Sequence, residues 1–196
     1  YIHFSTSNMA LSLRLGSTFP DLKCITNHGN MDSLHGYWTD ADGKATWGIL
    51  FSHPDDFTPV CTTELGCAQG MLPKFTERNV KLIALSCNGP ESHNEWIKDV
   101  TKVTGNTLTF PIIADVSRDI AVQLGALDPE LKSFDGLPAT VRAVYIVGPD
   151  RKIKLTLTYP PACGRNFDEI LRCVDSLQLT ATKKVATPAN WNINAE

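Results

Sequence analysis

Short continuous apolar runs alternate with helically spaced apolar residues through the middle of this chain. The runs at 47–52, 80–86 and 110–114 predict strands that are buried on both faces. Between them, apolar residues recur at helical spacing in the segments 65–75 and 96–103, which predicts helices packed against the sheet. The order strand, helix, strand, helix, strand is typical of a parallel α/β sheet.

The residues that flank the helical segments predict where two of the helices begin and end. Ser92 followed by Glu95 has the form of a capping box, and Gly105 predicts the end of that helix. A further short helix is expected between Ser117, as its N-cap, and Gly125.

The pattern changes in the last third of the chain. An apolar strand over 141–147, a turn at 148–151 and an alternating strand over 152–158 predict an antiparallel hairpin with one solvated face. Asn166 and Glu169 then cap a last amphipathic helix. A β-α-β half followed by a ββα half indicates a thioredoxin-like α/β fold, with a mixed central sheet flanked by helices.

The length predicts a single domain. A chain of 196 residues with 42% hydrophobic content builds one ordinary core with a modest appendage. We expect the thioredoxin-like domain to cover residues 10–182 and the short, mostly polar segment 183–196 to begin a C-terminal extension. Met9 is a candidate start of the natural chain, in which case residues 1–8 are an addition.

The charge of the chain argues against two classes of partner. The net charge is −3 and no lysine- or arginine-rich block is present, so neither nucleic acid nor an anionic membrane surface is expected as a partner. No apolar run has the length needed to cross a bilayer, and the first residues lack the pattern of a secretory signal. We therefore expect a cytoplasmic protein without stable membrane association.

The cysteines indicate neither a metal site nor a disulfide scaffold. No two of the six cysteines have Cys-x-x-Cys spacing, and no histidine stands at ligand spacing from any of them. We expect no metal and no other cofactor. Five cysteines are interpreted as reduced thiols of a cytosolic protein: Cys24, Cys67, Cys87, Cys163 and Cys173.

Cys61 differs from the other five because it falls in the predicted first turn of a helix. Thr58 is a suitable N-cap and Pro59 suits the first helical position, so Cys61 becomes the third helical residue. Unpaired backbone N–H groups and the positive end of the helix dipole favour a thiolate there. The alternative is a small buried hydrophobe, which is the commoner role of cysteine. The polar, turn-rich flanks favour a nucleophile.

Longer motifs extend this interpretation. The segment 53–66, HPDDFTPVCTTELG, resembles the peroxidatic-site signature of the 1-Cys peroxiredoxins, in the peroxiredoxin-6-like subfamily. Further matches follow in order at 110–115, at Arg142 with 148–150, at 164–172 and at 175–180, and the resemblance covers roughly residues 11–191. Chained motifs of this kind are far more specific than one short pattern.

The resemblance implies a role for each matching residue. Cys61 would be the peroxidatic cysteine, which attacks a hydroperoxide and becomes a sulfenic acid. Thr58 and Arg142 would hold the thiolate and align the peroxide oxygens, and Pro54 would shield the sulfur from water. His53 occupies the position where the subfamily places a histidine near the cysteine.

Some of these residues have simpler interpretations. Arg142 is a charged residue in an apolar strand, where pairing with a carboxylate would also explain it. His53 is also compatible with an ordinary loop histidine before proline. Arg165, which the resemblance places in the outer part of the site and among the substrate-binding residues, is explained almost as well by a surface ion pair.

The chain departs from its apparent relatives at three places. Thr187 stands where two-cysteine peroxiredoxins carry their resolving cysteine, so an external thiol such as glutathione or a thioredoxin-type protein is expected as reductant. Thr46 replaces the serine of the phospholipid-hydrolase motif found in some 1-Cys members, which argues against that activity. The subfamily continues well beyond Trp191, so we expect a truncated C-terminal arm.

Three functions follow as hypotheses. The first is a thiol peroxidase acting on hydrogen peroxide and organic hydroperoxides, in antioxidant defence and redox homeostasis, and dimeric through edge pairing of the strand 152–158. The second is a lipid hydrolase with Thr46 as nucleophile. The third is a redox sensor or holdase in which oxidation of Cys61 changes assembly.

Overall fold

The computed structural model describes residues 13–193. Its helices are α1 (Leu34–Tyr37), α2 (Pro59–Gly70), α3 (Leu72–Glu77), α4 (Pro90–Thr104), α5 (Asp119–Leu124) and α6 (Phe167–Lys183). Its strands are β1 (Cys24–Thr26), β2 (Gly29–Met31), β3 (Trp47–Ser52), β4 (Val80–Ser86), β5 (Ile112–Ala114), β6 (Leu127–Lys132), β7 (Pro138–Thr140), β8 (Arg142–Val147) and β9 (Ile153–Tyr159).

A seven-stranded mixed sheet forms the centre of the molecule, with the strand order β2-β1-β5-β4-β3-β8-β9. The three apolar runs of the first half form β3, β4 and β5, and these strands are parallel. The predicted hairpin of the second half forms β8 and β9, which are antiparallel to each other, and β8 runs antiparallel to β3. The predicted thioredoxin-like plan is confirmed.

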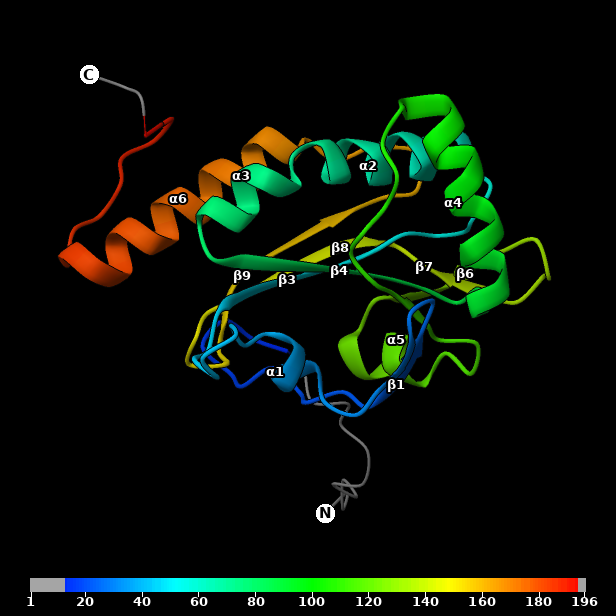
Figure 1. The fold of residues 1–196 in the computed structure, drawn as a ribbon, viewed down its shortest axis with the longest axis horizontal. Coiled ribbons are helices and arrows are strands. Elements are labelled where there is room, and N and C mark those ends of the chain that lie inside the picture. The colour runs from blue at the N-terminus through cyan, green and yellow to red at the C-terminus, as the bar shows by residue number, and fades with distance from the viewer. Residues whose placement is uncertain (1–12, 194–196) are drawn as a thin grey trace, which may run out of the picture.

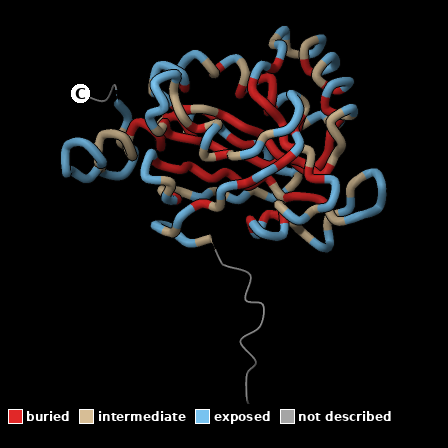
Figure 2. The backbone as a smooth tube through the Cα atoms, turned by 60° about the horizontal axis from the view of Figure 1, so that its bottom comes forward, coloured by how far each residue is buried: buried red, intermediate tan, exposed pale blue. Residues whose placement is uncertain are grey.

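Helices cover both faces of this sheet (Figure 1). One face packs against α2, α3, α4 and α6, and the other packs against α1, α5 and the N-terminal segment. Figure 2 shows that the buried backbone is concentrated in the central strands, which is why these strands are apolar on both faces. Gly48 in β3 allows the close approach of the Trp38 ring, which a Cβ atom would meet at 2.2 Å.

The starts of two helices differ from the predicted caps. α4 begins at Pro90, so Ser92 lies inside the helix and its hydroxyl donates to Asp56 instead of capping. The N-cap position of α5 is Arg118, and the Asp115 carboxylate accepts the free N–H groups of Ile120 and Ala121. The Ser92–Asp56 bond is a tertiary contact, whereas Asp115 lies only five and six residues before the N–H groups that it accepts, and each replaces the predicted cap.

The start of α2 agrees with the sequence, since its N-cap is Thr58 as predicted. The Thr58 side chain makes no capping hydrogen bond, however, and its hydroxyl donates to the Asp55 carbonyl oxygen. The helical pattern over 65–75 is divided at Met71, which ends α2 and caps α3. The cap of α6 is confirmed at Asn166, whose side chain accepts two backbone N–H groups.

The short strands β6 and β7 were not predicted. They form a separate two-stranded antiparallel sheet beside the main one, with an irregular register between Asp128 and Lys132. Near the start of the described chain, β1 and β2 form a short antiparallel hairpin.

The end of α6 at Lys183 falls next to the predicted domain boundary. Residues 184–193 contain no helix or strand, and they return toward α6 through hydrogen bonds of Arg172 with Trp191 and of Ser176 with Thr187. The division into 10–182 and 183–196 stays a prediction, and residues 1–12 and 194–196 lie outside the described part. None of the helices within residues 13–193 is long and apolar enough to cross a membrane.

Candidate active site

Cys61 is the third residue of α2, directly after β3 and the loop 53–58. The helix therefore directs its free N-terminal N–H groups toward the region of this cysteine, as the sequence predicted. The residue has no solvent exposure, and its thiol is free, like that of the other five cysteines.

Arg142 places a positive charge beside the sulfur. It is the first residue of β8 and is only 3% exposed, and its Nη1 donates to Cys61 Sγ at 3.3 Å. Its Nε and Nη2 both donate to the carbonyl oxygen of Pro161, at 2.9 and 2.8 Å. The guanidinium is thereby fixed in one orientation, with one N–H directed at the sulfur.

Glu64 joins this arginine to a second one. Arg142 Nη1 and Arg165 Nη2 each lie 2.7 Å from Glu64 Oε2, and Arg165 Nε donates to Oε1 at 3.0 Å. Glu64 and Arg165 are buried. Arg142 thus both contacts the sulfur and pairs with a carboxylate, so its two predicted roles coexist.

Arg165 lies behind Glu64, with no hydrogen bond to Cys61. Its Nη1 donates to the carbonyl oxygens of Ser52 and Ala143. The surface ion pair considered for Arg165 is wrong, because the residue is 7% exposed and its partners are buried. Its contacts support Glu64 and, through it, Arg142.

The charge state of Glu64 follows from these contacts. Burial tends to raise the pKa of its carboxyl, but the hydrogen bonds and charge of Arg165, together with the charge of Arg142, outweigh burial and lower that pKa. Glu64 is thus an anion held between two cations.

Thr58 and Pro54 line a cavity of about 310 Å³ beside Arg142, the residue that contacts the cysteine sulfur. Arg142, Val60, Pro161 and residues 131–134 also line it. Cys61 itself does not line the cavity, so side chains at its inner end must shift before a ligand contacts Sγ. The position of Thr58 in the lining of this cavity agrees with its predicted role, although its hydroxyl donates to the Asp55 carbonyl oxygen and not to Sγ.

His53 belongs to a buried polar network and makes no hydrogen bond to Cys61. Its Nε2 lies 3.0 Å from Asp56 Oδ1, and Asp56 Oδ2 accepts from Ser92 and lies 2.8 Å from His93 Nδ1. Burial lowers the pKa of His53, against the influence of Asp56. Burial tends to raise the pKa of Asp56, but hydrogen bonds from the two histidines prevail and lower it. The network ties the loop 53–58 to α4.

Three of the other cysteines lie where a thiolate is disfavoured. Burial is the main cause that raises the pKa of Cys24 to about 11, of Cys87 to about 12 and of Cys173 to about 11. This agrees with their interpretation as unreactive thiols. No group of three metal-ligating side chains suitable for an ion occurs in residues 13–193.

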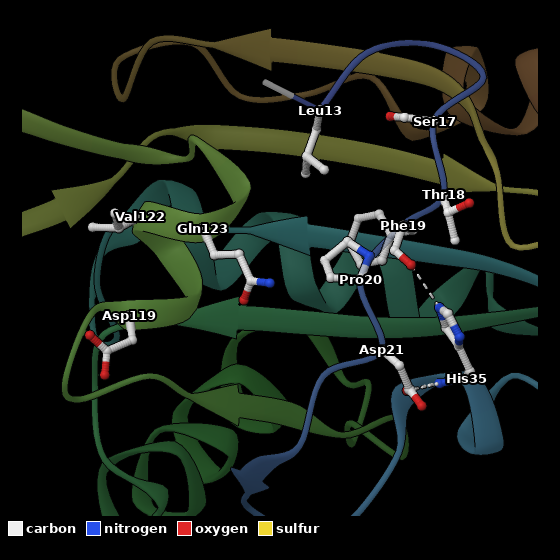
Figure 3. Close-up of a pocket in the computed structure, with 10 residues that line it drawn as sticks. All are labelled: Leu13, Ser17, Thr18, Phe19, Pro20, Asp21, His35, Asp119, Val122 and Gln123. Carbon is white, nitrogen blue, oxygen red and sulfur yellow. Dashed lines mark hydrogen bonds between the residues drawn. The ribbon is translucent and has the colours of Figure 1, made fainter. Parts of the chain in front are cut away.

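A second cavity, of about 530 Å³, opens on the other face of the sheet between the N-terminal segment, α1 and α5. Figure 3 shows that two of its polar side chains make contacts within the fold, because Asp21 accepts from the backbone N–H of His35, and the His35 ring bonds the Phe19 carbonyl oxygen. No cysteine lines it. The Thr46 hydroxyl is fully buried with no partner in the described chain, which gives the hydrolase hypothesis no activated nucleophile.

Sequence reasoning missed Glu64, Asp56 and His93. Glu64 follows Cys61 by three residues, so the helical period already placed the two in neighbouring positions. Two arginines assigned near one thiolate also required a counter-charge, and this was the available signal. For Asp56 and His93 the sequence carries no comparable signal.

Comparison with known proteins gives matches to peroxiredoxins over most of the chain. The AhpC/TSA family matches residues 15–156. The chain is 53% identical to peroxiredoxin-6 of Gallus gallus over 183 residues, which are 91% of this chain and 79% of that protein. It is 49% identical to a 1-Cys peroxiredoxin of Dirofilaria immitis over 195 residues, which cover 93% of this chain and 81% of the relative.

Two solved structures resemble the fold closely. A cysteine-to-serine mutant of the peroxiredoxin 6 of Arenicola marina superposes with a TM-score of 0.87 at 48% identity, covering 94% of this chain and 82% of that one. The yeast mitochondrial 1-Cys peroxiredoxin, described with its thiol resolving mechanism via glutathione/thioredoxin systems, gives a TM-score of 0.83 at 42% identity, with coverages of 93% and 84%.

Proposed function

Because the chain belongs to the AhpC/TSA family, in its 1-Cys peroxiredoxin (peroxiredoxin-6-like) subfamily, it is a thiol-dependent peroxidase, and we propose that Cys61 is its peroxidatic cysteine. The observation that carries this proposal is the 3.3 Å contact between Arg142 Nη1 and Cys61 Sγ at the N-terminus of α2. A fixed guanidinium and a helix N-terminus both stabilise a thiolate.

The reaction divides into an oxidation and a recycling step. The Cys61 thiolate attacks the terminal oxygen of the hydroperoxide, so that an S–O bond forms, the O–O bond breaks and an alkoxide or hydroxide leaves. The leaving oxygen takes up a proton and departs as alcohol or water. An external thiol then attacks the Cys61 sulfenic acid, water leaves, and a second thiol releases the mixed disulfide and restores Cys61.

Arg142 and Thr58 are proposed to align the peroxide. Arg142 stabilises the charge that moves from sulfur to the leaving oxygen, and Thr58, at the inner end of the cavity, hydrogen-bonds a peroxide oxygen. Pro54 keeps water from the thiolate. His53 is proposed to act through the loop, because its imidazole is occupied by Asp56. Arg165 is proposed to hold Glu64 and so the orientation of Arg142.

The external reductant is proposed to be glutathione or a thioredoxin-type protein. The yeast mitochondrial relative is described with both systems, and Thr187 stands in place of a resolving cysteine in this chain. We further propose a cytoplasmic location, since six free cysteines suit a reducing compartment.

The direct test replaces Cys61 by serine and follows consumption of hydrogen peroxide with excess thiol. We expect peroxide consumption to fall to the background rate, because serine lacks a nucleophile that is ionised at neutral pH. Cys67→Ser is the matched control: it lies in the same helix but is exposed and has no contact with Arg142, and it should retain activity. Unchanged peroxide consumption in Cys61→Ser would refute the assignment.

Rapid oxidation of Cys61 that no thiol reverses would favour the sensor or holdase hypothesis. Mass spectrometry of the Cys61 peptide after mixing with one equivalent of peroxide, with and without thiol, separates turnover from such a one-way oxidation.

A further inference from the structure

We infer that the β6–β7 hairpin is the specificity wall of the cavity at Cys61, and that Leu131 and Phe134 in this wall favour hydroperoxides with an apolar alkyl or aryl body. This inference rests on the proposed role of Cys61. It concerns residues that do not touch the reacting sulfur, so they act on the choice of substrate.

The cavity is larger than the smallest substrate requires. Its volume of about 310 Å³ is several times that of hydrogen peroxide, since a water molecule occupies about 30 Å³ in the liquid. Thr58 and Arg142 form the polar inner end, and Leu131 and Phe134 lie along the hairpin side. A peroxide group at the inner end would leave room for an apolar body beside these two side chains.

The tip of the hairpin is tied to the loop that carries the site. The Asp55 carboxylate is 5% exposed, and its Oδ2 accepts the backbone N–H of Phe134 at 2.8 Å. Asn88 donates its side-chain amide to the other carboxylate oxygen and accepts the backbone N–H of Asp56. A buried carboxylate thus holds residue 134 at a defined place over the cavity.

Three further contacts fix the rest of the hairpin. The Thr140 hydroxyl donates to the His53 carbonyl oxygen at 2.7 Å, which joins β7 to the start of the same loop. On the outer side, Arg118 donates to the Pro138 carbonyl oxygen and forms an ion pair with Asp135 at 2.8 Å. The wall is therefore attached at its base, its tip and its outer side.

The exposed ring of Phe134 favours binding of an apolar substrate body through the hydrophobic effect. Its side chain is 79% exposed, so a substrate body that covers the ring removes apolar surface of both partners from water. Hydrogen peroxide has no such surface and gains nothing from the wall. The hairpin should therefore raise the rate for apolar hydroperoxides relative to the rate for hydrogen peroxide. The reaction step at Cys61 should be the same for both.

The experiment uses the full chain and compares two peroxides. The second-order rate constant for oxidation of Cys61 is measured by rapid mixing, alkylation of the remaining thiol and mass spectrometry, without any reductant. Cumene hydroperoxide and hydrogen peroxide are the probes. The quantity compared between variants is the rate constant for cumene hydroperoxide divided by that for hydrogen peroxide. The variants are Phe134→Ala, Leu131→Ala and Asp55→Ala.

We expect this ratio to fall about fivefold in Phe134→Ala and in Leu131→Ala, in keeping with the modest discrimination that apolar contacts provide. Asp55→Ala should lower it as well, although every apolar side chain of the wall remains. Leu137→Ala is the control, because Leu137 is an exposed apolar residue of the same hairpin that does not line the cavity, and its ratio should equal that of wild type.

An unchanged ratio in both Phe134→Ala and Leu131→Ala would overturn the inference. An equal fall in Leu137→Ala would also overturn it, because the effect would then come from disturbance of the hairpin as a whole. Failure of hydrogen peroxide to oxidise Cys61 in the wild-type chain would refute the proposed function instead, and the two failures are thereby distinguished.

Discussion

At the residue scale, the orientation of Arg142 sets the charge and the hydrogen-bond donor that lie beside the sulfur of Cys61. One guanidinium contacts Cys61 Sγ, Glu64 Oε2 and the Pro161 carbonyl oxygen at once. Only a planar, forked cation can satisfy three such partners in one geometry.

Replacement of Arg142 by lysine keeps the charge but removes the fork. We expect the second-order rate constant for reaction with hydrogen peroxide to fall by about 10² to 10³, the usual range for loss of one preorganised donor. Stopped-flow mixing measures this constant. Arg172→Lys is the control, since Arg172 pairs with Glu169 on the surface and its replacement should have little effect. A change of less than twofold in Arg142→Lys would contradict the aligning role.

Glu64 is important for the stability of the fold, because it neutralises two buried cations. In Glu64→Gln, Arg142 and Arg165 remain buried without a counter-charge, and we expect the free energy of unfolding to fall by about 3–5 kcal/mol. Urea denaturation measures this loss. The same change at Glu169, in a half-exposed pair, should cost less than about 1 kcal/mol. Similar losses of unfolding free energy in the two variants would show that the buried ion pairs of Glu64 stabilise the fold no more than a surface pair does.

At the scale of elements, the Asp56 network joins the loop 53–58 to α4 and makes this junction sensitive to pH. The pKa of His53 is lowered by burial, so below its ordinary value of 6.5 the unfolded chain binds a proton that the folded chain does not. Stability therefore decreases as the pH falls below 6.5. The lowered pKa of Asp56 adds a second loss only below its ordinary value of 3.8.

We expect the free energy of unfolding to fall between pH 6.5 and pH 5 with a contribution from His53 of at most about 1.4 kcal/mol per pH unit. Urea midpoints at pH 7.5, 6.5, 5.8 and 5 measure this slope. His53→Gln should have a shallower slope than wild type, whereas His28→Gln, at an exposed position, should match wild type. Identical slopes in wild type and His53→Gln would contradict the linkage.

At the scale of the whole molecule, the sheet ends in two edge strands, β2 and β9. β9 is the longer edge, with seven residues against three, and the backbone N–H and C=O groups along its outer side can hydrogen-bond a second strand. We propose that two copies pair along β9 in a two-fold dimer, which would extend the sheet from one protomer into its partner.

If the dimer forms through β9, a charge introduced in β9 should dissociate it, whereas a charge introduced in β2 should not. Thr156→Lys would place like charges close together across a two-fold β9 pair, and we expect sedimentation analysis to show a shift from dimer to monomer. Asn30→Lys, in the β2 edge, should leave the dimer intact. A wild-type chain that sediments as a monomer, or equal dissociation in both variants, would reject pairing through β9.

Much of the fold could be predicted because its signals are local. The apolar runs that became β3 and β4 match the observed strands residue for residue, and Asn166 caps α6 as its chemistry requires. The start of α4 was wrong because Ser92 donates to Asp56, a residue 36 positions earlier. The hairpin β6–β7 was missed because its sequence has no clear alternation and its anchors, such as Asp55, are distant in the chain.

The sequence by itself determined the order of the central strands and of the longer helices, the position of Cys61 at a helix N-terminus and the residue types around it, because hydrophobic period, capping chemistry and helix geometry act over a few residues. Only the tertiary structure decided which partners these residues have. Glu64 meets Arg142 and Arg165 across 78 and 101 residues, and burial of all three makes their charges interdependent. Contacts of that separation depend on how the sheet brings distant segments together, and no local pattern specifies them.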